Sequence, residues 1–127
     1  MDVITEIDYQ SQIRKHRVIG SDTYADLKSY LLKLYDAPDF DDSLHSLWDF
    51  SLAEGIDNLT TEEVRALVLL VASKWNTSSQ VKSALVMSRE LEYGLARMYE
   101  MQLSAMSDNE IRVFKELDEA KKWVGML

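Results

Sequence analysis

The stretch VKSALVMSRELEYGLARM, residues 81–98, contains the two signals that decide the fold. Its first part, Val81 to Met87, is short and apolar and predicts a buried strand. From Arg89 to about Ser104 the apolar residues recur at helical spacing, which predicts a helix directly after that strand. The residues expected on the buried side of this helix are Leu91, Leu95, Met98 and Ala105.

The N-terminal half predicts two strands, then a helix, and then a third strand. Residues 3–9 and 13–19 are two short strands separated by a polar break of hairpin length, and Arg14 to Arg17 are expected to be exposed. A helix over 22–35 follows, with Ser21 or Asp22 as its cap. Residues 44–50 are then expected to form a strand and residues 51–59 a loop.

The segments that flank the opening stretch complete the pattern. A helix is predicted to begin after Thr60 and to reach about residue 75, followed by a polar turn over 76–80. Residues 109–114 alternate apolar and charged side chains and predict the last strand, and residues 117–127 predict a final helix.

The predicted order is therefore β-β-α-β-α-β-α-β-α. Strands separated by helices pair in parallel through right-handed crossovers, whereas the first hairpin adds an antiparallel strand at one edge. The sequence thus predicts an α/β fold with a mixed, mostly parallel five-stranded sheet and about four helices. A chain of 127 residues is long enough for a single domain over residues 1–127.

The composition excludes several classes of function. The chain has no cysteine, which excludes disulfides, thiolate catalysis and thiolate metal sites and favours the cytoplasm. The net charge of −8 opposes binding to nucleic acid. The N-terminus does not resemble a signal peptide, and the longest apolar run, residues 66–72, is too short to cross a bilayer. We expect a cytoplasmic protein without an integral membrane segment.

Acidic residues are concentrated in the middle of the chain. Between Leu34 and Val64 there are nine Asp and Glu residues and no Lys or Arg. We interpret them as solvated loops and a helix start, and the alternative is a basic partner or a divalent cation on that side.

Four stretches carry a resemblance to a known family: LWDFS (47–51), EYGLARM (92–98), IRVF (111–114) and DEAKKWV (118–124). Together with the order of strands and helices, they resemble the STAS superfamily, and more closely its SpoIIAA-like bacterial branch. The resemblance implies a bacterial domain that acts through protein contacts rather than catalysis. The fold is also similar to that of CRAL-TRIO lipid-exchange domains, which adds a lipid or small apolar ligand as an alternative.

Thr60 and Thr61 are the first candidate site. Thr60 and Glu63 have the spacing of a capping box, which is the interpretation we favour for this helix start. In better-known relatives of the family, a serine within Asp-Ser-Ser-Gly is phosphorylated at the corresponding place, so the resemblance implies a phospho-acceptor as the alternative. Here the stretch is Leu59-Thr60-Thr61-Glu62, which lacks the family's Asp and Gly.

A second candidate site lies at the carboxyl ends of the central strands, the usual ligand crevice of an open α/β sheet. The residues expected there are Asp49, Ser51, Ser88 and Arg89. A small anionic ligand would use Arg89, Ser51 and the free N–H groups of the following helix. The alternative is that Asp49 forms a turn and Arg89 lies at the surface.

No catalytic, metal or cofactor site is expected. The chain has two histidines, His16 and His45, and neither is close to a nucleophile motif or to metal-ligand spacing. His16 lies in the basic second strand and is expected to be exposed. The glycines do not form a phosphate-binding loop.

The third helix has more apolar residues than one buried stripe needs. Tyr99, Met101 and Leu103 are the candidates for a contact with a protein partner or with a second copy in a homodimer. We therefore expect a non-enzymatic protein-interaction or regulatory domain. The alternative is a domain that binds a lipid or a small apolar ligand, in the crevice or in a pocket between helices.

Overall fold

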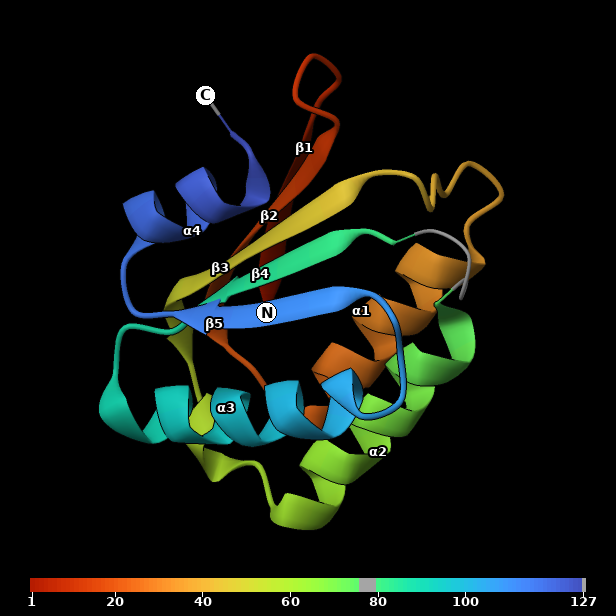
Figure 1. The fold of residues 1–127 in the computed structure, drawn as a ribbon. Coiled ribbons are helices and arrows are strands. Elements are labelled where there is room, and N and C mark those ends of the chain that lie inside the picture. Colours follow the sequence, from red (N-terminus) through yellow and green to blue (C-terminus); the bar gives the residue numbers. More distant parts are fainter. Residues whose placement is uncertain (76–79, 127) are drawn as a thin grey trace.

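The computed structural model describes residues 1–75 and 80–126 and contains one five-stranded sheet with strand order β1-β2-β3-β4-β5 (Figure 1). Strands β1 and β2 pair antiparallel, and the other neighbours pair in parallel. The predicted fold class is confirmed. The strands are β1 (Asp2–Asp8), β2 (Ile13–Ser21), β3 (His45–Glu54), β4 (Lys82–Val86) and β5 (Glu110–Phe114), and the helices are α1 (Tyr24–Asp36), the 3₁₀ turn η1 (Ile56–Asn58), α2 (Thr61–Lys74), α3 (Glu90–Ser104) and α4 (Leu117–Val124).

The helices cover the two faces of the sheet unequally. Helices α1, α2 and α3 lie on one face, and α4 lies on the other (Figure 1). Because side chains alternate along a strand, Leu85 of β4 joins the larger core under the three helices, whereas Ala84 and Val86 pack with Ala120 and Val124 of α4. The two faces thus have separate cores.

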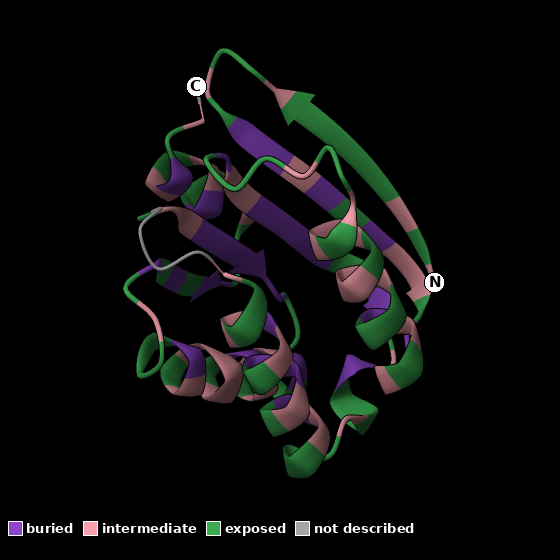
Figure 2. Ribbon diagram, turned by 90° about the vertical axis from the view of Figure 1, so that its right-hand side faces the viewer, coloured by how far each residue is buried: buried purple, intermediate pink, exposed green. Residues whose placement is uncertain are grey.

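The central strands are buried and β1 is exposed (Figure 2). Strand β1 lies at one edge of the sheet and, within the described residues, pairs only with β2. Its apolar residues Ile4 and Ile7 are 51% and 39% exposed, so this strand contributes little to either core.

Strand β3 is longer than predicted. The stretch 51–59, expected to be a loop, continues the strand to Glu54, because Leu52, Ala53 and Glu54 still pair with the end of β2. Gly55 then ends the strand with a φ of 91°, a conformation that favours glycine.

The predicted exposure of residues 14–17 is wrong for two of them. Arg14 and His16 are 4% and 0% exposed, because α1 and the following loop cover this face of β2. The Arg14 guanidinium donates to the Asp41 carbonyl oxygen and lies 4.4 Å from the centre of the Phe40 ring. Burial lowers the pKa of Arg14 from its usual value.

The buried side of α3 also differs from the prediction. Leu91 is 73% exposed and Ala105 is exposed too, whereas Glu92, Ala96 and Leu103 are buried. The helix therefore packs partly through the small Ala96 and the carboxylic acid Glu92. The spacing of hydrophobic residues does not predict that these two are buried. The predicted turn over residues 76–80 falls almost entirely outside the described residues, as does Leu127 of the final helix.

Candidate functional site

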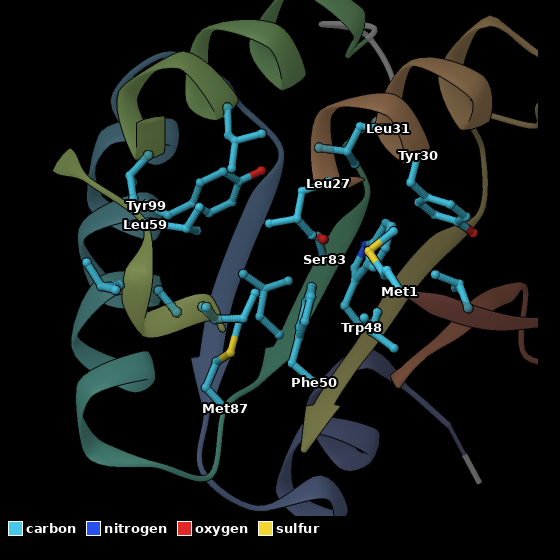
Figure 3. Close-up of a pocket in the computed structure, with 18 of the residues that line it drawn as sticks. Met1, Leu27, Tyr30, Leu31, Trp48, Phe50, Leu59, Ser83, Met87 and Tyr99 are labelled. Carbon is cyan, nitrogen blue, oxygen red and sulfur yellow. The ribbon is translucent and has the colours of Figure 1, made fainter. Parts of the chain in front are cut away.

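An apolar cavity of about 90 Å³ lies between the sheet and helices α1, α2 and α3 (Figure 3). Strands β3 and β4 contribute Phe50 and Leu85, and the three helices contribute Leu27, Leu67 and Ala96. Ala96 leaves space where a larger side chain would fill the gap between α3 and the strands. No Asp, Glu, Lys, Arg or His lines the cavity in the described part of the chain.

An aromatic cluster forms one wall of this cavity. The Trp48 ring stacks on the Phe50 ring at 6.0 Å and meets the Tyr30 ring edge-on at 5.8 Å. On its other side, the Trp48 ring is stacked on the buried imidazole of His16. Packing of this kind favours a rigid wall, because each ring fixes the next.

His16 is held by hydroxyl groups rather than by charges. The hydroxyls of Thr5 and Tyr30 each lie 3.0 Å from His16 Nδ1, and they lie 2.9 Å from one another. Nε2 of His16 is buried and has no hydrogen-bond partner among residues 1–75 and 80–126. Burial, with a smaller effect of the Arg14 charge, lowers the pKa of His16 to about 3, so the ring is neutral at physiological pH.

The hydroxyl groups around the cavity differ in whether they are already paired. The Tyr35 hydroxyl accepts a hydrogen bond of 3.1 Å from Trp75 Nε1, and burial raises the pKa of Tyr35. The hydroxyls of Ser83 and Tyr99 have no hydrogen bond within the described part of the chain. Both residues belong to the cavity lining.

The four residues predicted at the carboxyl ends of the strands are not brought together into a pocket. Asp49 is buried within β3, and its carboxylate accepts from the Ser51 backbone N–H of the same strand. Ser51 and Ser88 are exposed. The Arg89 side chain is 55% exposed, and its guanidinium donates to the Ala53 carbonyl oxygen. None of these residues lines the apolar cavity.

Thr60 and Thr61 lie at the start of α2. The Thr60 hydroxyl accepts from the Glu63 N–H at 3.1 Å, and the Glu63 carboxylate accepts from the Thr60 N–H at 2.9 Å. The predicted capping box is confirmed. Thr61 is the first residue of the helix and is exposed. The second capping box is formed by Thr23 and Asp26, so Thr23, not Ser21 or Asp22, caps α1.

The three candidate interface residues lie in different environments. Met101 is 66% exposed, whereas Leu103 is fully buried and cannot meet a partner at the surface of this structure. Tyr99 is partly buried and lines the cavity. Only Met101 of the three has the exposure that the prediction required.

Two buried carboxylic acids were not predicted. Asp22 and Glu92 are 4% and 2% exposed, and both oxygens of Asp22 and Oε1 of Glu92 have no hydrogen-bond partner among the described residues. Arg89 Nη2 lies 3.5 Å from Glu92 Oε1, an ion pair without a hydrogen bond. Asp22 is buried where the ends of β2 and β3 approach each other. There its backbone N–H donates to the Glu54 carbonyl oxygen.

Burial dominates the electrostatics of these two acids. It raises the pKa of Asp22 to about 6, the charges of Asp26 and Glu92 raise it further, and the N-terminal ammonium opposes them. Burial also raises the pKa of Glu92, against the opposing effect of Arg89. Within the described residues, no three His, Asp or Glu side chains are grouped to hold a metal ion.

His45, the second histidine, has a structural role. Its Nδ1 accepts a hydrogen bond of 2.9 Å from the Lys82 backbone N–H, which links the starts of β3 and β4. None of the helices within residues 1–75 and 80–126 has the length and apolar character that a bilayer crossing demands.

Comparison with known proteins supports the fold. No family model matches the sequence, and no match is found among the curated proteins. A solved structure is similar: an uncharacterized protein from the DUF3478 family with a SpoIIAA-like fold, from Shewanella loihica PV-4. Its TM-score is 0.57 at 16% sequence identity, over 97% of this chain and 92% of that chain. The chain therefore has a SpoIIAA-like fold, as the resemblance predicted.

Proposed function

We propose that this chain is a non-enzymatic binding domain that takes a small, mainly apolar ligand in the cavity between the sheet and helices α1, α2 and α3. The observation that carries the proposal is the cavity itself, which is partly open and is lined by side chains of three helices and four strands. Removing apolar surface from water there would contribute roughly 25 cal/mol per Å² to binding.

The lining favours binding over catalysis. General acid–base chemistry is most often carried out by His, Asp, Glu or Lys, and the described lining residues include none of these. The lining tyrosines stay protonated, because burial raises the pKa of Tyr30, Tyr35 and Tyr99. The absence of cysteine and the family resemblance support a bacterial, cytoplasmic setting.

The size of the cavity limits the ligand. A cavity of roughly 150 Å³ in another protein holds one benzene molecule. A volume of about 90 Å³ is smaller, so it suits a few heavy atoms or the apolar end of a longer molecule. A long lipid chain would not fit inside without movement of the helices.

Xenon binding tests the proposal, because xenon enters dry apolar cavities. We expect xenon pressure to shift the methyl NMR signals of Leu85, Val64 and Leu67, which line the cavity. The variant Ala96→Leu fills the space and should suppress these shifts, whereas Ala25→Leu, on the exposed side of α1, should not. Unshifted lining methyls in the unmodified protein would refute the proposal. Native mass spectrometry of freshly purified protein then shows whether a ligand is retained.

A second candidate function is contact with a protein partner or a second copy. It is favoured by Met101, which is 66% exposed on α3. Light scattering should show a dimer whose dissociation constant rises in Met101→Glu but not in Ser29→Glu, an exposed position on α1. A monomer at all concentrations contradicts self-association through this helix.

A further inference from the structure

The walls of the apolar cavity contain two hydroxyl groups that the protein itself does not satisfy. Ser83 of β4 is 6% exposed, and Tyr99 reaches the cavity from α3. Figure 3 shows the Ser83 oxygen on the cavity side of its strand and the Tyr99 ring extending inward from the helix. Neither hydroxyl has a hydrogen bond within the described part of the chain.

The position of Ser83 is unusual for its residue type. In the alternation of β4, residue 83 falls on the face that also presents Leu85 to the larger core. Its hydroxyl has no hydrogen bond among the described residues and is open to the cavity rather than sealed in the core. A bound molecule that offers a partner would therefore pair with it, which an alanine at this position could not do.

The other hydroxyl groups of the lining are already engaged. The Tyr30 hydroxyl lies in the cluster with Thr5 and His16, and the Tyr35 hydroxyl accepts from Trp75. Burial raises the pKa of Tyr99 well above its usual value, so its phenol stays neutral and can donate. Ser83 and Tyr99 thus remain as the hydroxyls available to a ligand.

We propose that the ligand of this cavity is an apolar molecule or segment with one hydrogen-bonding group, such as a hydroxyl or carbonyl oxygen, and that Ser83 recognises this group, with Tyr99 as the second donor. The inference rests on the proposed function and adds the chemical class of the ligand. A purely apolar cavity rejects a ligand hydroxyl because burying it unpaired is unfavourable. A cavity with free hydroxyls accepts it.

2-Propanol and propane form the matched pair of probes, because they differ by one hydroxyl and have the few heavy atoms that a volume of about 90 Å³ holds. Their dissociation constants are measured by NMR titration, with propane applied under pressure, on the full chain, on Ser83→Ala and on Tyr99→Phe. The control is Ser88→Ala, an exposed serine beyond the end of the same strand.

We expect the unmodified protein to bind 2-propanol at least as tightly as propane. In Ser83→Ala, 2-propanol binding should weaken by roughly tenfold while propane binding is unchanged or tighter, because the hydroxyl of 2-propanol is then buried unpaired. Tyr99→Phe should weaken 2-propanol binding in the same direction, and it provides an independent test if Ser83→Ala does not fold.

The failures can be told apart. If propane binds and 2-propanol binds much more weakly to the unmodified protein, the cavity prefers purely apolar ligands, and the inference about the ligand class is wrong while the proposed function stands. The same conclusion follows if both variants keep the preference for 2-propanol. If neither probe binds, the proposed function fails together with the inference.

Discussion

The imidazole of His16 lies parallel to the indole of Trp48, with ring centres 3.9 Å apart and planes inclined by 21°. The contact joins β2 to β3 at a paired position and seals one wall of the cavity. It is made by a neutral ring, since burial lowers the pKa of His16 to about 3.

This relationship predicts a loss of stability in acid. An unfolded histidine takes up a proton near its ordinary pKa of 6.5, whereas the folded one does so only near 3, so the free energy of unfolding falls as the pH is lowered through this window. The loss is at most about 5 kcal/mol. Urea unfolding of the unmodified protein and of His16→Phe checks it, and the variant should lose most of this dependence. An unchanged pH profile in His16→Phe would mean that other groups cause it.

Asp22 predicts a pH dependence of the free energy of unfolding with the opposite sign. Its pKa is raised from 3.8 to about 6, so the folded state holds the proton more tightly, and the free energy of unfolding falls as the pH rises from about 4 to 6. We expect Asp22→Asn to unfold at a higher urea concentration at pH 7.5, with a gain of at most about 3 kcal/mol. Asp108→Asn, at an exposed position, serves as the control and should change little. A destabilised Asp22→Asn at pH 7.5 would show that the ionised carboxylate has an undetected partner.

Two glycines predict opposite effects of the same substitution. A Cβ on Gly55 would lie 2.6 Å from the Asp22 carbonyl oxygen, at a φ of 91°, so Gly55→Ala should destabilise the protein by roughly 2 kcal/mol or more. Gly94 lies within α3 and a Cβ there meets no atom within 4 Å, so Gly94→Ala should stabilise it by about 1 kcal/mol. Thermal unfolding monitored by circular dichroism checks both. Equal effects of the two substitutions would contradict the difference in environment.

At the start of α2, helix capping and phosphorylation are two separate hypotheses for Thr60 and Thr61. Thr60→Ala should lower the free energy of unfolding by about 1 kcal/mol, because the hydroxyl caps the Glu63 N–H. Thr61→Ala should leave it almost unchanged, since the Thr61 side chain is exposed. Urea unfolding of both variants tests this. If Thr61→Ala rather than Thr60→Ala lowers the free energy of unfolding, the capping assignment is wrong. Phosphorylation of either threonine is a separate proposal, which in-cell mass spectrometry tests.

The sequence predicted the strand and helix order because local spacing carries that information. The strand expected over Val81 to Met87 is found with each end within one residue of its predicted position. The helix that follows begins and ends within one residue of its predicted bounds. The capping box at Thr60 was equally readable, since it depends on two residues three positions apart.

The cavity could not be predicted in the same way. It is the volume that remains when side chains of several elements pack together, and a residue such as Ala96 matters through what it leaves empty. Burial of His16 and Asp22 was missed for a related reason. Their polar character suggested exposure, but their positions next to α1 and the end of β3 are set by long-range packing.

Thr5 of edge strand β1 contacts His16 directly, and among the described residues β1 pairs on one side only, with β2. Detachment of this one strand would let solvent hydrate the imidazole while the four parallel strands stay assembled. Acid would then act first by local fraying, and amide exchange in β1 would speed up at a pH where the rest of the chain is still protected.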